Sequence, residues 1–163
     1  TQQRVAKILR RQIVNLCDGS IGVERSALES TGRDLVQQFS TQGRLNMRSS
    51  RLVYEWLLST LEIGRAILAI RRSQQRLYSH YRHPKIEASL LCIKSFFDAP
   101  SLELRKTLLQ SLSETIRMLR NENIPTENIQ MKRMKNLITE LALIHTVLQN
   151  DLSLPIATED SCR

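Results

Sequence analysis

Residues 51–79 read RLVYEWLLSTLEIGRAILAIRRSQQRLYS, and this stretch decides the fold class. Its apolar and small residues recur at three- and four-residue steps, so a helix places them on one side. That side carries Leu52, Trp56, Ser59, Ile63, Ala66, Ile67 and Ile70. At 1.5 Å per residue such a helix would be about 45 Å long. We therefore expect it to form the centre of a helical bundle.

The same stretch is too short and too charged to cross a membrane. Its most apolar part, residues 56–70, contains Glu62 and Arg65 and falls short of the roughly 20 residues that a transmembrane helix needs. Glu62 and Arg65 are three residues apart, so a helix brings them together as an ion pair. An exposed pair would add little to the stability of the fold. A buried pair would cost more desolvation free energy and would be more informative.

Breaks with clear chemical causes divide the rest of the chain into helix-length pieces. Asp18, Gly19 and Ser20 end the first piece, Pro84 suits the first turn of a later helix, and Ser101 is placed to cap another. Helices are predicted over residues 2–17, 23–41, 51–79, 85–97, 102–121 and 127–149. Gly32 weakens the second by about 1 kcal/mol relative to Ala.

The fold class that follows is all-α. We expect an antiparallel up-and-down bundle of about six helices, with one long central helix and no strands. Residues 1–150 would form this single domain, and the polar, aperiodic residues 151–163 would be a disordered tail. Because the chain starts at Thr1 and not at Met, we expect it to be a fragment of a longer protein.

The charge is divided unevenly along the chain. The net charge is +8; residues 1–83 contain 14 Lys and Arg and 6 Asp and Glu, whereas residues 84–163 contain 10 of each. A one-sided basic field predicts a polyanionic neighbour: nucleic acid, an anionic lipid surface, or organic anions drawn toward a pore. Charge alone does not choose among them.

The densest basic run is the candidate binding patch. It consists of Arg71, Arg72, Arg76 and Arg82, at the end of the long helix. These side chains could face an anionic substrate or lipid headgroups, and cations also favour a helix C-terminus. The alternative is an ordinary solvated face.

The sequence discloses no catalytic, metal or cofactor site. It lacks a glycine-rich phosphate loop, an HExxH motif and a nucleophile elbow, so we predict that it is not an enzyme and binds no cofactor. His80 and His83 have a spacing that could hold a metal, but basic neighbours repel cations, and we expect two partly exposed histidines. We expect His145 to be a core or boundary residue.

Three other side-chain groups are assigned to structure and not to function. Trp56 is expected to anchor the core, because readers of nucleic acid interleave several exposed aromatics with basic residues. Met131 and Met134 are expected to fill the core as well. Cys17, Cys92 and Cys162 cannot all pair with one another and lack zinc or redox spacing, which favours a reducing, cytosolic compartment.

A family resemblance emerges from two runs of residues. The first holds Arg25, Leu28-Glu29-Ser30 and Arg33-Asp34-Leu35, and the second is residues 56–72, WLLSTLEIGRAILAIRR. Together they resemble the soluble domain of the fusaric acid resistance (FUSC) family, which includes the aromatic acid exporters. The later helices, with Phe96 and Phe97 before a break, fit the order of helices in that family. The resemblance covers residues 23–149.

The resemblance implies a function that the residues alone do not. The parent would be a bacterial inner-membrane efflux transporter of organic acids, such as fusaric or hydroxybenzoic acid. This chain would be its domain on the cytoplasmic side, attached to the transmembrane part of the same polypeptide and acting in assembly, gating or anion attraction. A homo-oligomer and a periplasmic adaptor subunit are the partners expected, an anionic lipid surface is a further candidate, and nucleic acid is not expected. The alternative is a basic helical module that associates with nucleic acid or with other proteins.

Overall fold

The computed structural model describes residues 2–19, 26–34, 37, 47–77, 83–99, 101–122 and 128–150. All the regular elements among these residues are helices, which confirms the all-α prediction. The labelled helices are α1 (Gln2–Asp18), α3 (Met47–Leu77), α4 (Pro84–Asp98), α5 (Leu102–Arg120) and α6 (Asn128–Asn150). A further helical segment covers residues 26–34. The predicted tail, 151–163, lies outside the described residues.

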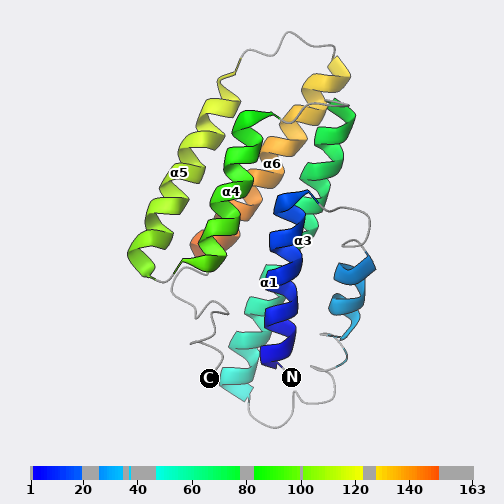
Figure 1. The fold of residues 1–163 in the computed structure, drawn as a ribbon, viewed down its shortest axis with the longest axis vertical. Coiled ribbons are helices and arrows are strands. Elements are labelled where there is room, and N and C mark those ends of the chain that lie inside the picture. Colours follow the sequence, from blue (N-terminus) through cyan, green and yellow to red (C-terminus); the bar gives the residue numbers. More distant parts are fainter. Residues whose placement is uncertain are drawn as a thin grey trace.

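The five labelled helices form a closed ring. α1 packs against α3 and α4, α3 against α6, α6 against α5, and α5 against α4. From α3 to α6 successive helices run in alternating directions (Figure 1), as an up-and-down bundle requires. The segment 26–34 lies outside this ring, beside α1 and α3 (Figure 1). α3 is the longest helix, as the sequence predicted.

The ring encloses one hydrophobic core to which every labelled helix contributes. The fully buried side chains are mostly aliphatic and recur at helical spacing. They include Leu9, Ile13 and Leu16 from α1, Leu57, Ile67 and Ile70 from α3, Ile86, Leu90 and Ile93 from α4, and Leu137 and Leu141 from α6. Trp56 is buried among them, which confirms its predicted role as a core anchor.

The helix ends confirm the predicted signals. The Ser101 hydroxyl accepts a hydrogen bond from Leu104 N (3.2 Å) and caps α5. Pro84 occupies the first turn of α4. Gly19 ends α1 with a φ of 109°, a left-handed conformation that glycine adopts without strain.

Two glycines let the segment 26–34 and α3 approach closely. A Cβ on Gly64 would lie 2.9 Å from Leu28 Cδ2, and one on Gly32 would lie 3.1 Å from Leu61 Cδ2. Each leucine therefore occupies the space over the glycine of the opposite element. A buried hydrogen bond from Gln12 Nε2 to Thr31 Oγ1 (3.1 Å) ties the same segment to α1. Gly32, which sequence reasoning treated only as a weak point in a helix, is thus a packing contact.

We expect Gly64→Ala to lower the free energy of unfolding by about 1 kcal/mol. The new Cβ must displace the buried Leu28 side chain, and overpacking of this kind costs about 1–3 kcal/mol. The helix propensity gained by Ala, about 1 kcal/mol, offsets only part of that cost. Urea denaturation followed by circular dichroism measures the difference.

The matched control is the same substitution in a Leu28→Ala background, where the obstructing methyl groups are gone. There Gly64→Ala should be neutral or stabilising. An equal loss in both backgrounds would show that the contact with Leu28 is not the cause.

Candidate functional site

The prediction of an exposed basic patch is wrong for Arg71, its first residue. The Arg71 side chain is only 3% exposed, so it does not face a lipid surface or a substrate. Arg72 is half-buried. The Arg76 side chain and all of Arg82 lie outside the described residues, so their part of the patch stays a prediction. The error arose because a dense basic run was taken for a surface, although one of its arginines belongs to the core side of the helix.

Arg71 instead joins three helices through its guanidinium. Its Nε donates to Leu16 O (3.0 Å), and its two terminal nitrogens donate to Cys17 O, to Gln74 Oε1 (3.2 Å) and to both carboxylate oxygens of Glu87. Arginine has five N–H donors, and these contacts engage all five. Gln74 Nε2 adds a bond to Glu87 Oε1 (3.3 Å). The end of α1, the body of α3 and the first turn of α4 are thereby fixed to one another.

The chemistry of a helix end explains why an arginine is buried there. The last carbonyls of α1 have no partner within the helix, and the C-terminus carries partial negative charge. A guanidinium satisfies both conditions, and Glu87 compensates its positive charge in the partly dry interior. A sequence signal for this role existed: Arg71 and Gln74 continue the three- and four-residue steps of the apolar side from Ile67.

A second polar cluster joins α4 to the end of α5. His83, the residue before α4, accepts a hydrogen bond from Lys85 N at its Nδ1 (3.1 Å), while its Nε2 lies 2.9 Å from Glu122 Oε2. Lys85 Nζ also donates to Glu122 Oε1 (3.2 Å). His83 is buried, so the prediction of a partly exposed histidine was wrong for this residue. The reason is that it caps α4 and pairs with Glu122; His80 lies outside the described residues.

The charges of this cluster act on Glu122. Burial raises the pKa of the Glu122 carboxyl, but the hydrogen bonds from Lys85 and His83 and the positive charge of Lys85 outweigh burial and hold that pKa below its ordinary value of 4.5. Among the described residues no group of three or more His, Cys, Asp or Glu side chains is placed to hold a metal ion. The cluster is therefore an electrostatic clamp between two helices.

The remaining candidates fall into structural roles. Met134 is buried, as predicted, and the Met131 side chain lies outside the described residues. His145 is half-buried. Burial raises the pKa of the Cys17 thiol to about 12 and raises that of Cys92, which disfavours a nucleophilic thiolate at either residue.

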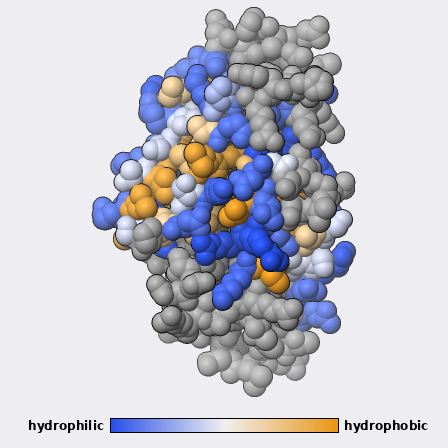
Figure 2. Space-filling view, in the orientation of Figure 1, coloured by the Kyte–Doolittle hydropathy of each residue, from blue (hydrophilic) through white to orange (hydrophobic). Residues whose placement is uncertain are grey.

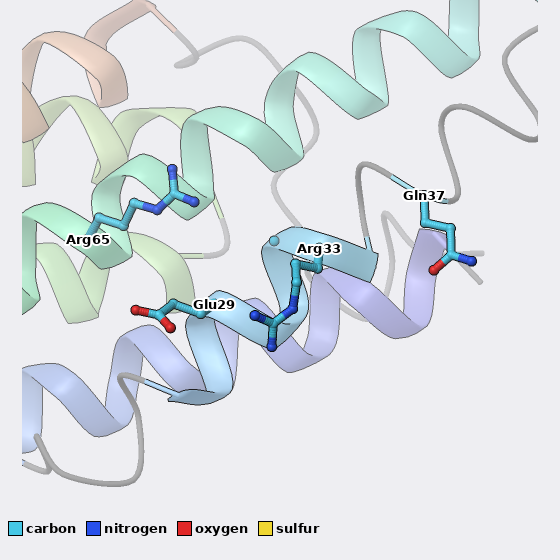
Figure 3. Close-up of a pocket in the computed structure, with 5 residues that line it drawn as sticks. Glu29, Arg33, Gln37 and Arg65 are labelled. Atoms are coloured by element: carbon cyan, nitrogen blue, oxygen red, sulfur yellow. The ribbon is translucent and has the colours of Figure 1, made fainter.

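A groove between the segment 26–34 and α3 is a candidate for binding an anion. Its volume is about 520 Å³, and it is lined by Glu29, Gly32, Arg33, Gln37 and Arg65. Glu29 and Arg33 come from the segment and Arg65 from the facing side of α3 (Figure 3). Glu62 and Arg65 are both exposed, which excludes the buried ion pair considered from sequence. Two guanidinium groups and one carboxylate give the groove a positive balance.

Comparison with known proteins decides the family. The model of the fusaric acid resistance protein family matches residues 1–154. This chain belongs to the fusaric acid resistance protein family. No curated protein and no solved structure matches it.

Membership of the fusaric acid resistance protein family confirms the resemblance found in the sequence. The family is one of membrane-associated efflux proteins, and so the function of this chain is related to transport. Within the described part of the chain, no helix combines the length and the apolar character needed to cross a membrane.

We expect Arg71→Ala to lower the free energy of unfolding by about 3–5 kcal/mol. The substitution removes the guanidinium from Cys17 O and from the Glu87 carboxylate, and leaves Leu16 O with the bond from Gly19 N. Arg71→Lys should recover part of this loss, because it keeps the charge but offers three donors in place of a planar fork.

The matched control for this measurement is Arg72→Ala, the neighbouring half-buried arginine. Its effect should stay within about 0.5 kcal/mol, as is usual for substitutions away from the core. If both alanine variants had the same effect in urea denaturation, the five-donor contact would not be the source of stability.

The loss of stability of the folded protein at low pH should depend on Glu122. Because the folded pKa is lowered, its stabilisation is fully present above pH 4.5 and is lost as pH falls through the lowered value. We expect Glu122→Gln to be less stable than the wild type at pH 6, with the difference shrinking toward zero as the pH is taken well below 4.5. A difference that does not change between these pH values, measured by urea denaturation, would contradict the clamp.

Proposed function

We propose that this chain is the cytoplasmic domain of a bacterial inner-membrane efflux transporter that exports organic, aromatic acids. In this proposal it acts in assembly, gating or attraction of the anionic substrate, and not in catalysis. The observation that carries the proposal is the family match over residues 1–154. The parent would supply the transmembrane part of the same polypeptide and recruit a periplasmic adaptor.

The charge of the chain supports a role in attracting anions. All of the net +8 comes from residues 1–83, which include the groove-lining Arg33 and Arg65. A positive field raises the local concentration of an anion and its rate of encounter with a nearby site. The carboxylate of an aromatic acid fits an arginine side chain through paired N–H donors. Contact of lipid headgroups with Arg72, Arg76 and Arg82 remains part of the proposal.

The test is an export assay in cells that produce the parent transporter. We expect the double substitution Arg33→Gln and Arg65→Gln to slow export of 4-hydroxybenzoate by roughly 2–10-fold at low internal concentration. This range corresponds to the loss of two exposed charge contacts that together contribute about 0.4–1.4 kcal/mol, since each such contact contributes about 0.2–1 kcal/mol. Saturating substrate should restore the rate, because the groove raises local concentration and performs no chemical step.

The control removes two exposed cations elsewhere, with Lys106→Gln and Arg120→Gln on α5. It makes the same change in net charge and should leave export unaltered. Equal slowing by both double variants would assign the effect to net charge and not to the groove. No transport by the parent, together with salt-dependent binding of this chain to nucleic acid, would overturn the proposal in favour of the alternative module.

A further inference from the structure

α4 and α5 are joined at one end of the bundle by polar groups. The two helices run in opposite directions, so the start of α4 lies beside the end of α5 (Figure 1). Apolar side chains are exposed over the outer sides of both helices (Figure 2). At the shared end, by contrast, the helices are held by the cluster of His83, Lys85 and Glu122. Of these three side-chain types, histidine is the one that ordinarily exchanges a proton near neutral pH.

The hydrogen bonds of His83 determine which ring nitrogen carries the proton. A backbone N–H can only donate, and Lys85 N donates to His83 Nδ1 (3.1 Å), so Nδ1 carries a lone pair. In a neutral ring the proton is then on Nε2, which lies 2.9 Å from Glu122 Oε2 and donates to it. The folded structure therefore uses a neutral His83 ring with both nitrogens engaged.

Histidine is an unusual residue at the start of a helix. The common capping residues are Ser, Thr, Asp and Asn, whose side-chain oxygens accept from the first free N–H groups. In α4, Pro84 has no N–H, and Glu87 N bonds to His83 O (3.0 Å). Lys85 N is thus a donor that depends on a side-chain acceptor, and His83 Nδ1 is that acceptor. An imidazole ring has no acceptor left once it is protonated, because both of its nitrogens then donate.

A second proton on His83 would change both contacts of Lys85. The proton would bind at Nδ1 and face the Lys85 N–H, and two donors do not form a hydrogen bond. The charged ring would also be drawn to the Glu122 carboxylate, whose other oxygen already accepts from Lys85 Nζ (3.2 Å). Two cations would then compete for one carboxylate. Protonation of His83 therefore opposes Lys85 at its backbone N–H and at its ammonium group.

The other charged side chains near this end are engaged elsewhere or exposed. Glu87 lies in the first turn of α4, and its carboxylate accepts from Arg71. In the last turns of α5, Arg117 pairs with Glu114, and Arg120 is exposed. In the described part of the chain, the charges that the hydrogen bonds bring to the His83 ring are therefore those of Lys85 and Glu122.

The surroundings of His83 make a charge on its ring consequential. The residue is 8% exposed, so water does little to screen a new charge there. Glu122 would attract the charge, and its carboxylate stays ionised in mild acid because its pKa is held below 4.5. Lys85 would repel the charge. Protonation would thus keep the ring beside Glu122 and weaken the hold on Lys85.

We propose that His83 is a pH-sensitive cap, which holds the start of α4 to the end of α5 when its ring is neutral and releases Lys85 when the ring is protonated. Glu87, which binds Arg71, lies in the same first turn of α4. Loosening of this turn therefore reaches the contact that joins α4 to α3 and to the end of α1. The proposal goes beyond the proposed function, and it is measured on the chain without substrate, so failure of either leaves the other untouched.

The first test locates the ring protons by NMR of the His83 ring nitrogens in the full 163-residue chain. At about pH 7.5 we expect a neutral ring with its proton on Nε2, and at about pH 5.5 a ring with a proton on each nitrogen. A proton on Nδ1 at the higher pH would overturn the proposal. So would a ring that stays neutral at the lower pH.

The second test is hydrogen exchange at the Lys85 amide, expressed as a protection factor so that the intrinsic pH dependence of exchange is removed. We expect the protection factor to fall roughly 2–30-fold between the two pH values, which corresponds to the loss of a helix cap. The amide of Ile116, in the middle of α5, should keep its protection. An equal fall at Ile116 would indicate a global change and overturn the local one, as would an unchanged Lys85.

The matched variant is His83→Asn, because asparagine accepts at the same capping position but does not titrate. In this variant the protection of Lys85 should be the same at both pH values. His80→Gln and His145→Gln remove the other two histidines of the chain and should each keep the response of the wild type.

A response that persists in His83→Asn, or one that is lost in His80→Gln or His145→Gln, would assign the effect to another group and overturn the proposal. The ring-nitrogen spectrum and the Lys85 exchange of the wild type need no variant. They therefore decide the matter even if His83→Asn does not fold.

Discussion

One arginine sets the relative positions of three helices in this bundle. Arg71 donates to the last carbonyls of α1, to Gln74 on its own helix and to Glu87 on α4. Apolar packing is tolerant of small rotations and shifts, but five hydrogen bonds from a rigid planar group are not. The hydrophobic core supplies most of the drive to fold, while Arg71 fixes where α1 ends against α3 and α4.

The sequence predicted the helices because their signals are local. Periodic apolar residues, Gly19, Pro84 and Ser101 each act within one or two turns, and they placed the described helix ends within a few residues. The burial of Arg71 was missed because it depends on Leu16 and Cys17, more than 50 positions away along the chain. The prediction for His83 was wrong for the same reason, since its partner Glu122 lies 39 positions away, just beyond the end of α5. The groove could not be predicted either, because Arg33 and Arg65 line it together only when the segment 26–34 packs on α3.

The net positive charge of the chain lies in the half that forms the groove. Residues 1–83 hold all of the net +8, and in the groove Arg33 and Arg65 outnumber the one carboxylate, Glu29. This positive balance suits a small anion.

The closed ring has a consequence for how the protein is made. Its last contact on the amino-terminal side joins α1 to α4, where Arg10 pairs with Asp98 from 88 positions away. A ribosome adds about 5–20 residues per second, so Arg71, 55 positions after Leu16, is added roughly 3–11 seconds later, and Asp98, 88 positions after Arg10, roughly 4–18 seconds later. Until α3 has been made, the apolar side of α1 and its last carbonyls lack the contacts that cover them in the folded protein. The newly made α1 is therefore open to chaperones before the bundle can close.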